Sequence, residues 1–175
     1  MGFLVYTGLR REEIMGLCWD HIHLEEGYGE VKQVVVYPGN KQAILKENPK
    51  TEASARIFFI PRPLQELLLP SQTKSGFVIH GRNANGPAPH ATMKRNYTAA
   101  FEQLGIKGQY DNHDFRSTFG TQMKESGLTF AQVADLLGHA DTRMVETIYA
   151  RARKQSILKH QAAIEKMNSA YACGS

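Results

Sequence analysis

Residues 113–149 constrain this chain more than any other stretch of its sequence. His113 and Arg116 are three positions apart, so on a helix they project from the same face. An isolated Leu-Gly-His ends at His139, and Tyr149 follows ten positions later. An arginine fork can hold two oxygens of a phosphate, and a histidine beside it can move a proton near neutral pH. Together, the four side chains favour a site that handles a phosphodiester.

Each of these residues alone has an ordinary structural explanation. One His and one Arg at this spacing most often form a surface pair, or the histidine lies in the core with its hydrogen bonds made. A histidine just after a helix end, such as His139, is most often incidental, and Tyr149 could pack in the core with its hydroxyl at the edge. The functional interpretation depends on finding them in combination.

A second arginine occurs far upstream, in the segment TGLRREE. Arg10 directly follows Thr7-Gly8-Leu9, and Glu13 comes one helical turn later. In the simplest interpretation, Arg10 is a solvated charge at a helix start, paired with Glu13. In the functional one, Glu13 holds the Arg10 guanidinium from behind. Two arginines on one phosphate are chemically sensible, because phosphoryl transfer concentrates negative charge on the equatorial oxygens.

The apolar pattern predicts a chain that is mainly α with a small three-stranded antiparallel sheet. Gly8 is expected to end the first helix in the left-handed conformation, and Thr129 with Gln132 forms a capping-box pattern. The hairpin between the last two strands carries Lys50 near its tip. Helices are predicted at 3–9, 10–17, 63–69, 92–104, from 113, from 129 to 137, 142–153 and 156–168, and strands at 31–37, 43–46 and 55–60.

Composition narrows the setting of the protein. The sequence holds 21 Lys and Arg against 17 Asp and Glu, a formal charge of +4 that suits a polyanionic partner. Its two cysteines fit a reduced, intracellular environment, and no apolar run approaches the roughly 18 residues of a membrane span. Zinc-ligand spacings and a phosphate-binding glycine loop are both absent from the sequence, so chemistry without a metal or other cofactor is expected.

The ordered motifs TGLRREE, PKTEASAR, HDFR, LGH and a following tyrosine resemble those of the tyrosine recombinases, the phage integrase family. The resemblance covers residues 1–155 and is closest to the integrases of phages and conjugative transposons. It implies a recombinase catalytic domain over 1–155, lacking the family's upstream core-binding domain. Residues 156–175 would be a C-terminal helix and tail, which either packs into a neighbouring subunit or folds back in cis.

The resemblance also implies a role for each motif residue. Tyr149 would attack the scissile phosphate and form a 3′-phosphotyrosyl link. Lys50 would protonate the leaving 5′-oxygen, and His113 would assist proton transfer at the tyrosine. The remaining members would hold the phosphate, with Glu13 supporting one arginine. The expected catalytic set is Arg10, Lys50, His113, Arg116, His139 and Tyr149.

The function implied is that of a site-specific DNA recombinase or integrase of a mobile element. Its expected partners are double-stranded DNA at a recombination site and further copies of the chain in a tetramer, with accessory DNA-bending proteins as further candidates. The expected location is the cytoplasm of a bacterium or phage host. Two alternatives are a type IB topoisomerase, which would relax supercoils as a monomer, and a non-catalytic DNA-binding remnant of an integrase.

Overall fold

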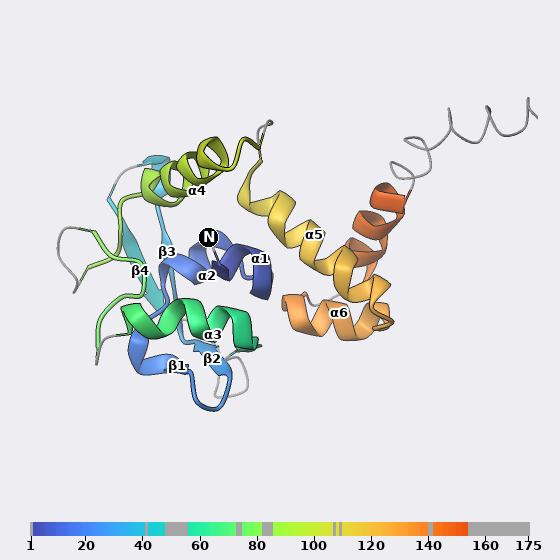
Figure 1. The fold of residues 1–175 in the computed structure, drawn as a ribbon, viewed down its shortest axis with the longest axis horizontal. Coiled ribbons are helices and arrows are strands. Elements are labelled where there is room, and N and C mark those ends of the chain that lie inside the picture. Colours follow the sequence, from blue (N-terminus) through green and yellow to red (C-terminus); the bar gives the residue numbers. More distant parts are fainter. Residues whose placement is uncertain are drawn as a thin grey trace, which may run out of the picture. The chain divides into compact units, whose positions relative to one another are not determined.

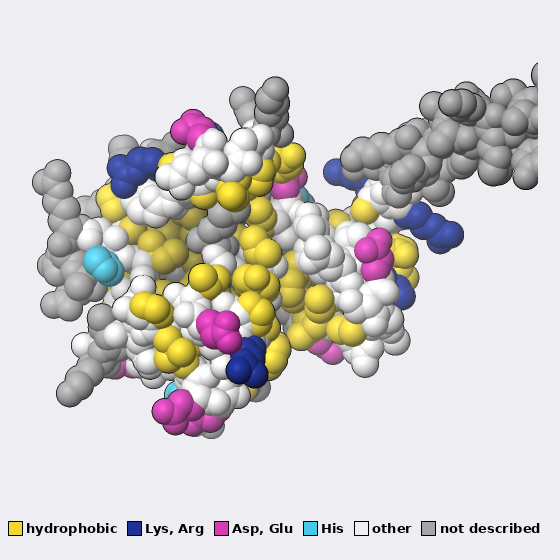
Figure 2. Space-filling model, in the orientation of Figure 1, with side chains coloured by type: hydrophobic (Ala, Val, Ile, Leu, Met, Phe, Trp, Pro, Cys, Tyr) yellow, Lys and Arg dark blue, Asp and Glu magenta, His cyan; other side chains and the backbone are white. Residues whose placement is uncertain are grey.

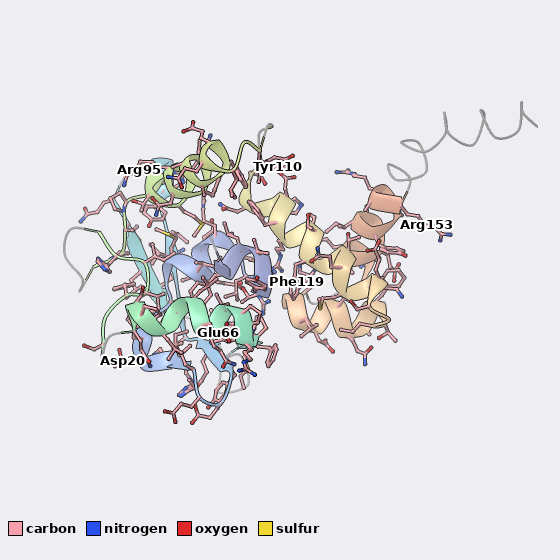
Figure 3. The ribbon with its side chains drawn as sticks, viewed as in Figure 1. Asp20, Glu66, Arg95, Tyr110, Phe119 and Arg153 are labelled. Atoms are coloured by element: carbon pink, nitrogen blue, oxygen red, sulfur yellow. The ribbon has the colours of Figure 1, made fainter. Side chains whose placement is uncertain are left out.

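The protein is described here from a computed structural model, which covers residues 2–40, 42–47, 56–72, 75–81, 86–106, 108, 110–139 and 142–153. These residues fall into two units, which divide after Phe119 and are each described by themselves. The boundary lies inside helix α5 (Asn112–Glu125). Figure 1 shows the elements, and Figure 3 labels Phe119, the last residue of the first unit.

The first unit is built on short helices whose ends are set by local chemistry. Helix α1 (Gly2–Thr7) ends at Gly8, which has the positive φ of 60° predicted for it. Helix α3 (Arg62–Leu68) has a proline in its first turn, where the missing N–H costs nothing. Helix α4 (Ala91–Gln103) buries Met93, Tyr97 and Phe101, which recur every four residues along one face. Helix α2 (Arg11–Met15) follows α1 directly.

Two small antiparallel sheets complete this unit. The three-stranded sheet has the order β1 (Ile22–His23), β2 (Tyr28–Val31) and β5 (Arg56–Phe59). The two-stranded sheet pairs β3 (Gln33–Val36) with β4 (Ile44–Glu47). Short 3₁₀ turns cover Trp19–His21, Pro38–Asn40 and Leu69–Ser71. Helix α3 packs against α1, and α2 packs against β3 (Figure 1).

The prediction of a mainly α chain with a small antiparallel sheet is confirmed, but the strands are distributed differently. The single strand predicted at 31–37 is divided at Lys32, because Val31 ends β2 and Gln33 begins β3 in the other sheet. The hairpin predicted between the last two strands is wrong, because β4 and β5 belong to different sheets. Strand β1 and the first three residues of β2 are missing from the prediction. They are short, and β2 contains Gly29, a residue disfavoured in strands. Gly29 is required here, because a Cβ would lie 2.5 Å from the Phe58 ring.

Aromatic packing joins α4 to the start of α5. The rings of Phe101 and Phe115 are stacked, with centroids 5.8 Å apart, and Tyr97 lies 6.0 Å from Phe115. Tyr97 and Phe101 belong to the buried core of the first unit, and Phe115 packs against that core. This anchor fixes the helical turn that carries the neighbouring residue, Arg116.

The second unit contains the end of α5, helix α6 (Phe130–Leu137) and a helical segment at 143–153. The predicted capping box is present: the Thr129 side chain accepts from the Gln132 backbone, and the Gln132 side chain accepts from the Thr129 backbone N–H. Gly138 ends α6 with φ 62°. Gly120 allows close packing, since its Cβ position lies 3.2 Å from Leu137. Val133 and Val145 are buried in this unit.

The surface of the first unit is partly apolar. Figure 2 shows hydrophobic side chains exposed over α3, where Leu67 is 61% exposed, and Leu69 in the following turn is 56% exposed. Within the described part of the chain, no helix is long and apolar enough to cross a membrane. Lys50 and the helix predicted at 156–168 lie outside the described residues.

Candidate anion-binding site

A buried carboxylate, Glu13 of α2, lies between two arginines. Its Oε1 is 2.9 Å from Nη1 of Arg10, and its Oε2 is 2.8 Å from Nη1 of Arg56. Glu13 is 6% exposed, and the Arg56 side chain is 12% exposed, so solvent screens this contact weakly. Glu13 therefore ties helix α2 to strand β5 and at the same time fixes the direction of the Arg10 side chain.

The local sequence explains why Arg10 and Glu13 meet. After the left-handed turn at Gly8, the next residue, Leu9, is buried and 1% exposed. Arg10 is then the N-cap of α2 in an extended conformation, and its backbone N–H donates to Glu13 Oε2 at 2.7 Å. A carboxylate in the first turn is also stabilised by the helix dipole. The Arg10 side chain remains 43% exposed, which leaves it accessible to a ligand.

Arg116 of α5 joins the same cluster from a distant part of the chain. It is 6% exposed, and its Nη1 donates to the backbone carbonyl of Gly8 at 2.5 Å. Burial lowers the pKa of Arg116 to about 10, and the positive charges of Arg10 and Arg56 act in the same direction. Glu13 opposes this shift. Arg116 is still protonated at neutral pH, in a place where other positive charges already gather.

The cluster has an excess of positive charge. Among the residues that the structure describes, three guanidinium groups, from Arg10, Arg56 and Arg116, gather near one carboxylate, Glu13. The pKa of Arg56 is lowered by burial and, more weakly, by Arg10, while Glu13 raises it. A bound anion would relieve the repulsion among these groups. Arginine forks match the oxygens of a phosphate, so the arrangement is suited to a phosphate ligand.

Arg56 was not predicted as a site residue, although the sequence contained a signal for it. Along strand β5, Ile57 and Phe59 are 63% and 64% exposed, whereas Phe58 is 4% exposed. Side chains alternate between the two faces of a strand, so Arg56 must point inward with Phe58. An arginine on an inward face needs a charged or polar partner. That alternation, applied to ARIFFI, would have identified it.

His113 lies in the first turn of α5, three residues before Arg116, and is exposed. Asp111 caps this helix, since its Oδ1 accepts from the backbone N–H groups of His113 at 2.7 Å and Asp114 at 3.1 Å. Asp114 Oδ2 accepts in return from the Asp111 backbone at 2.8 Å. These reciprocal bonds fix the start of α5 and hence the direction of His113.

His139 and Tyr149 belong to the second unit. His139 follows the Gly138 cap, and its backbone N–H donates to the Ala134 carbonyl at 2.9 Å. The Tyr149 ring packs edge-on against Phe130, with centroids 5.7 Å apart. Nζ of Lys124 lies 5.0 Å from the Phe130 centroid and 5.9 Å from that of Tyr149. The tyrosine ring is thus held between α6 and a lysine near the end of α5.

The structure thus brings three predicted residues together, Arg10, Glu13 and Arg116, and adds Arg56. It places His113 on the helix of Arg116, and His139 and Tyr149 in the second unit. Among the residues that the structure describes, no three His, Cys, Asp or Glu side chains are grouped to hold a metal ion.

A family model described as the phage integrase family matches residues 1–156. The chain belongs to the phage integrase family. One curated relative is the tyrosine recombinase XerD of Lacticaseibacillus casei. The two sequences are 29% identical over 157 residues, which cover 87% of this chain and 49% of that protein. The chain therefore spans about half the length of the curated relative.

Two solved structures show the same fold. The XerA recombinase has a TM-score of 0.68 at 18% identity, over 91% of this chain and 54% of that one. The Tn1549 transposon integrase, solved in complex with circular intermediate DNA, has a TM-score of 0.66 at 18% identity, over 89% of this chain and 57% of that one. The resemblance to phage integrases and the predicted catalytic-domain fold are both confirmed.

Proposed function

We propose that this chain is the catalytic domain, over residues 1–155, of a site-specific DNA recombinase that integrates a mobile element. The observation that carries the proposal is the meeting of Arg10 and Arg116 around Glu13 and Gly8 in a member of the phage integrase family. A relative is named a tyrosine recombinase, and a structural neighbour is a transposon integrase bound to DNA. The proposed ligand of the cluster is a phosphate of the DNA backbone.

The cluster supports this role because its guanidinium groups are oriented before any ligand arrives. Arg116 is directed by an uncharged carbonyl, that of Gly8, and Arg10 by a carboxylate that also serves Arg56. Preorganised charge stabilises a transition state without the cost of reorganisation at the moment of reaction. The removal of one such donor typically reduces a rate by about 10² to 10³.

The proposed reaction needs only groups of the protein and the DNA. The Tyr149 hydroxyl attacks the scissile phosphorus, a bond from Oη to phosphorus forms, and the bond to the 5′-oxygen breaks. The tyrosine proton passes to His113, and Lys50 supplies a proton to the leaving 5′-oxygen. Arg10, Arg116 and His139 stabilise the charge on the non-bridging oxygens. Attack of another strand's 5′-hydroxyl on the phosphotyrosine reverses these steps and joins the new ends.

The remaining parts of the proposal concern partners and setting. Double-stranded DNA is the proposed substrate, in agreement with the formal charge of +4. We further propose assembly of a tetramer on two recombination sites, with residues 156–175 as a contact between subunits, and work in the cytoplasm of a bacterial or phage-host cell. Accessory DNA-bending proteins are candidate partners.

A covalent-trapping experiment tests the function. A binding selection from random duplexes first identifies a preferred site, and nicked versions of that site then serve as suicide substrates. The loss of the short fragment beyond the nick prevents rejoining, so a protein–DNA adduct accumulates and is seen on a denaturing gel. The proposal expects an adduct with the wild-type chain and none with Tyr149→Phe. The absence of an adduct at saturating DNA would favour the non-catalytic remnant.

The same material separates the recombinase from a type IB topoisomerase. A recombinase exchanges strands between two copies of the selected site and has little effect on supercoiled DNA that lacks it. A topoisomerase relaxes any supercoiled plasmid. Site-independent relaxation without strand exchange would contradict the recombinase assignment.

A further inference from the structure

We infer that Arg56 is a positioning residue of the proposed phosphate site, acting through Glu13. The inference rests on the proposed function, since the ligand considered is the DNA phosphate. Arg56 is not a predicted site residue, and its side chain is only 12% exposed. It is too enclosed to be the group that meets the substrate, and its Nη1 donates to Oε2 of Glu13 at 2.8 Å.

The two oxygens of Glu13 have different partners. Oε1 accepts from Nη1 of Arg10, while Oε2 accepts from Nη1 of Arg56 and from the Arg10 backbone. Because Arg56 occupies Oε2, the carboxylate cannot turn to give both oxygens to the Arg10 side chain. Arg10 therefore meets Glu13 through one guanidinium nitrogen, Nη1, and not through a bidentate contact. A bidentate pair with Glu13 would occupy the two guanidinium N–H groups that a bidentate contact with a phosphate requires.

Arg56 also sets the charge that a phosphate meets. Counted over the described residues, the cluster has three guanidinium groups and one carboxylate with Arg56, an excess of two positive charges, and the excess is one without it. Arg56 acts on Arg116 as well, since its charge contributes to the lowered pKa of that group. In an enclosed site such charges act strongly on one another. The residue thus influences both phosphate-binding arginines without contacting the ligand.

A purely structural role is the competing explanation, because the Arg56–Glu13 contact also ties β5 to α2. The two roles differ in what they predict for the reaction. A tether affects the fraction of folded protein and nothing else. A positioning residue affects the rate constant of cleavage at saturating DNA in protein that is fully folded, and its effect depends on Glu13.

The test uses the full chain with the selected duplex as probe, and compares Arg56→Gln, Glu13→Gln and the double variant with wild type. Arg62→Gln is the matched control, since the Arg62 side chain is 88% exposed and pairs with Glu66 of the same helix, α3. Figure 3 labels Glu66. Three quantities are measured: the single-turnover rate constant of Tyr149-dependent adduct formation, the DNA concentration at half-saturation, and the melting temperature.

We expect Arg56→Gln to lower the rate constant by about 10- to 100-fold, the usual range for a lost supporting contact. The DNA concentration at half-saturation should change less than the rate constant. Arg62→Gln should have the wild-type value of both quantities. The double variant should lose less than the product of the two single losses, because both substitutions interrupt one linkage. Arg56→Lys, which keeps the charge, should recover part of the rate.

Three results would overturn the inference. The first is a folded Arg56→Gln variant with a wild-type rate constant, and the second is a double variant whose losses multiply independently. If Arg56→Gln does not fold, the uncharged variant Arg56→Met replaces it, and a wild-type rate constant for that variant is the third. If the wild-type chain forms no Tyr149-dependent adduct, the proposed function is wrong, and the inference that depends on it is wrong as well. If the wild-type chain forms the adduct and Arg56→Gln forms it at the same rate, the inference is wrong but the proposed function is not contradicted.

Discussion

The Arg116 guanidinium donates a hydrogen bond to the backbone carbonyl of Gly8, 108 residues earlier in the chain. A carbonyl oxygen has no net charge, so this bond orients the guanidinium without neutralising it. The acceptor is available because Gly8 adopts a positive φ of 60°, which ends α1. A helix cap at one end of the sequence thus directs a charged group at the other.

The carboxylate between the arginines should be important for stability. Glu13→Ala removes the group that both Arg10 and Arg56 contact, and Glu13 is only 6% exposed. Breaking a buried ion pair by deleting one partner typically costs about 3–5 kcal/mol. Urea unfolding followed by circular dichroism measures the free energy of unfolding. Glu12→Ala is the control, because Glu12 pairs with Arg11 in a more exposed place, with 34% of its side chain accessible, and should cost less than Glu13→Ala. Equal losses in the two variants would contradict the burial argument.

The proposed nucleophile can be removed with little effect on packing. Tyr149→Phe keeps the ring that lies edge-on to Phe130, so the free energy of unfolding should change by only about 0.5 kcal/mol. Adduct formation should fall below detection, because the attacking oxygen is gone. Tyr110→Phe, at a tyrosine that is 43% exposed, should leave the adduct unchanged. An adduct that survives in Tyr149→Phe would show that another residue attacks the phosphate.

The proposed acid Lys50 can be tested with a modified substrate. Lys50→Ala should slow cleavage of ordinary DNA by about 10² to 10⁴, the usual contribution of a general acid. A 5′-bridging phosphorothiolate should restore the rate, because a thiolate leaves without a proton far more readily than an alkoxide. Single-turnover cleavage of the two substrates measures the difference.

Lys46→Ala provides the comparison for this test. Lys46 is an exposed residue of β4, in the same segment of the chain. This variant should cleave both substrates as wild type does. A Lys50→Ala variant that is equally slow on the phosphorothiolate would show that the lysine does not supply the proton.

Alkaline pH should reveal the environment of Arg116. Its pKa is about 10 in the folded protein, well below the ordinary value of an arginine in the unfolded chain. Between these two values the unfolded chain binds more protons, so this group makes the folded state more stable as pH rises. Below about pH 10 the arginine is charged in both states, and its burial opposes folding.

The measurement is the difference in free energy of unfolding between wild type and Arg116→Leu, taken at pH 9 and pH 11. Wild type should gain stability relative to the variant on going to pH 11, while groups that titrate elsewhere cancel in the comparison. A difference that stays constant would show that Arg116 is not held at a lowered pKa.

The sequence predicted the helices well because their ends have local signals. Thr129 with Gln132, and Gly138, mark the two ends of α6, and both predictions are confirmed. It also placed Arg10 beside Glu13, since three residues within a helix determine that distance. The contact of Arg116 with Gly8 requires the tertiary fold, and no local pattern indicates it.

The strands were predicted less well, for a physical reason. Val31 and Gln33 lie in one run of β-branched and polar residues, yet they belong to different sheets. Strand propensity says which residues can extend but not which strand they will pair with. Arg56 closes the PKTEASAR motif, but its place in the motif predicts no role for it, whereas its alternation with Ile57 along the strand indicates an inward side chain. The catalytic roles of Arg10, Lys50, His113, Arg116, His139 and Tyr149 stay predictions.

The pairing of Gly29 with Phe58 has a consequence for the arginine cluster. These two residues are partners in the β2–β5 ladder, as are Val31 and Arg56. A shift of that ladder by a single residue would turn every side chain of the strand to its opposite face, and Arg56 would leave Glu13 for water. A Cβ at Gly29 would come within 2.5 Å of the Phe58 ring, so the glycine lets the ring lie across it in this register. A design that transfers the arginine cluster to another scaffold would therefore also have to include a glycine at the position of Gly29.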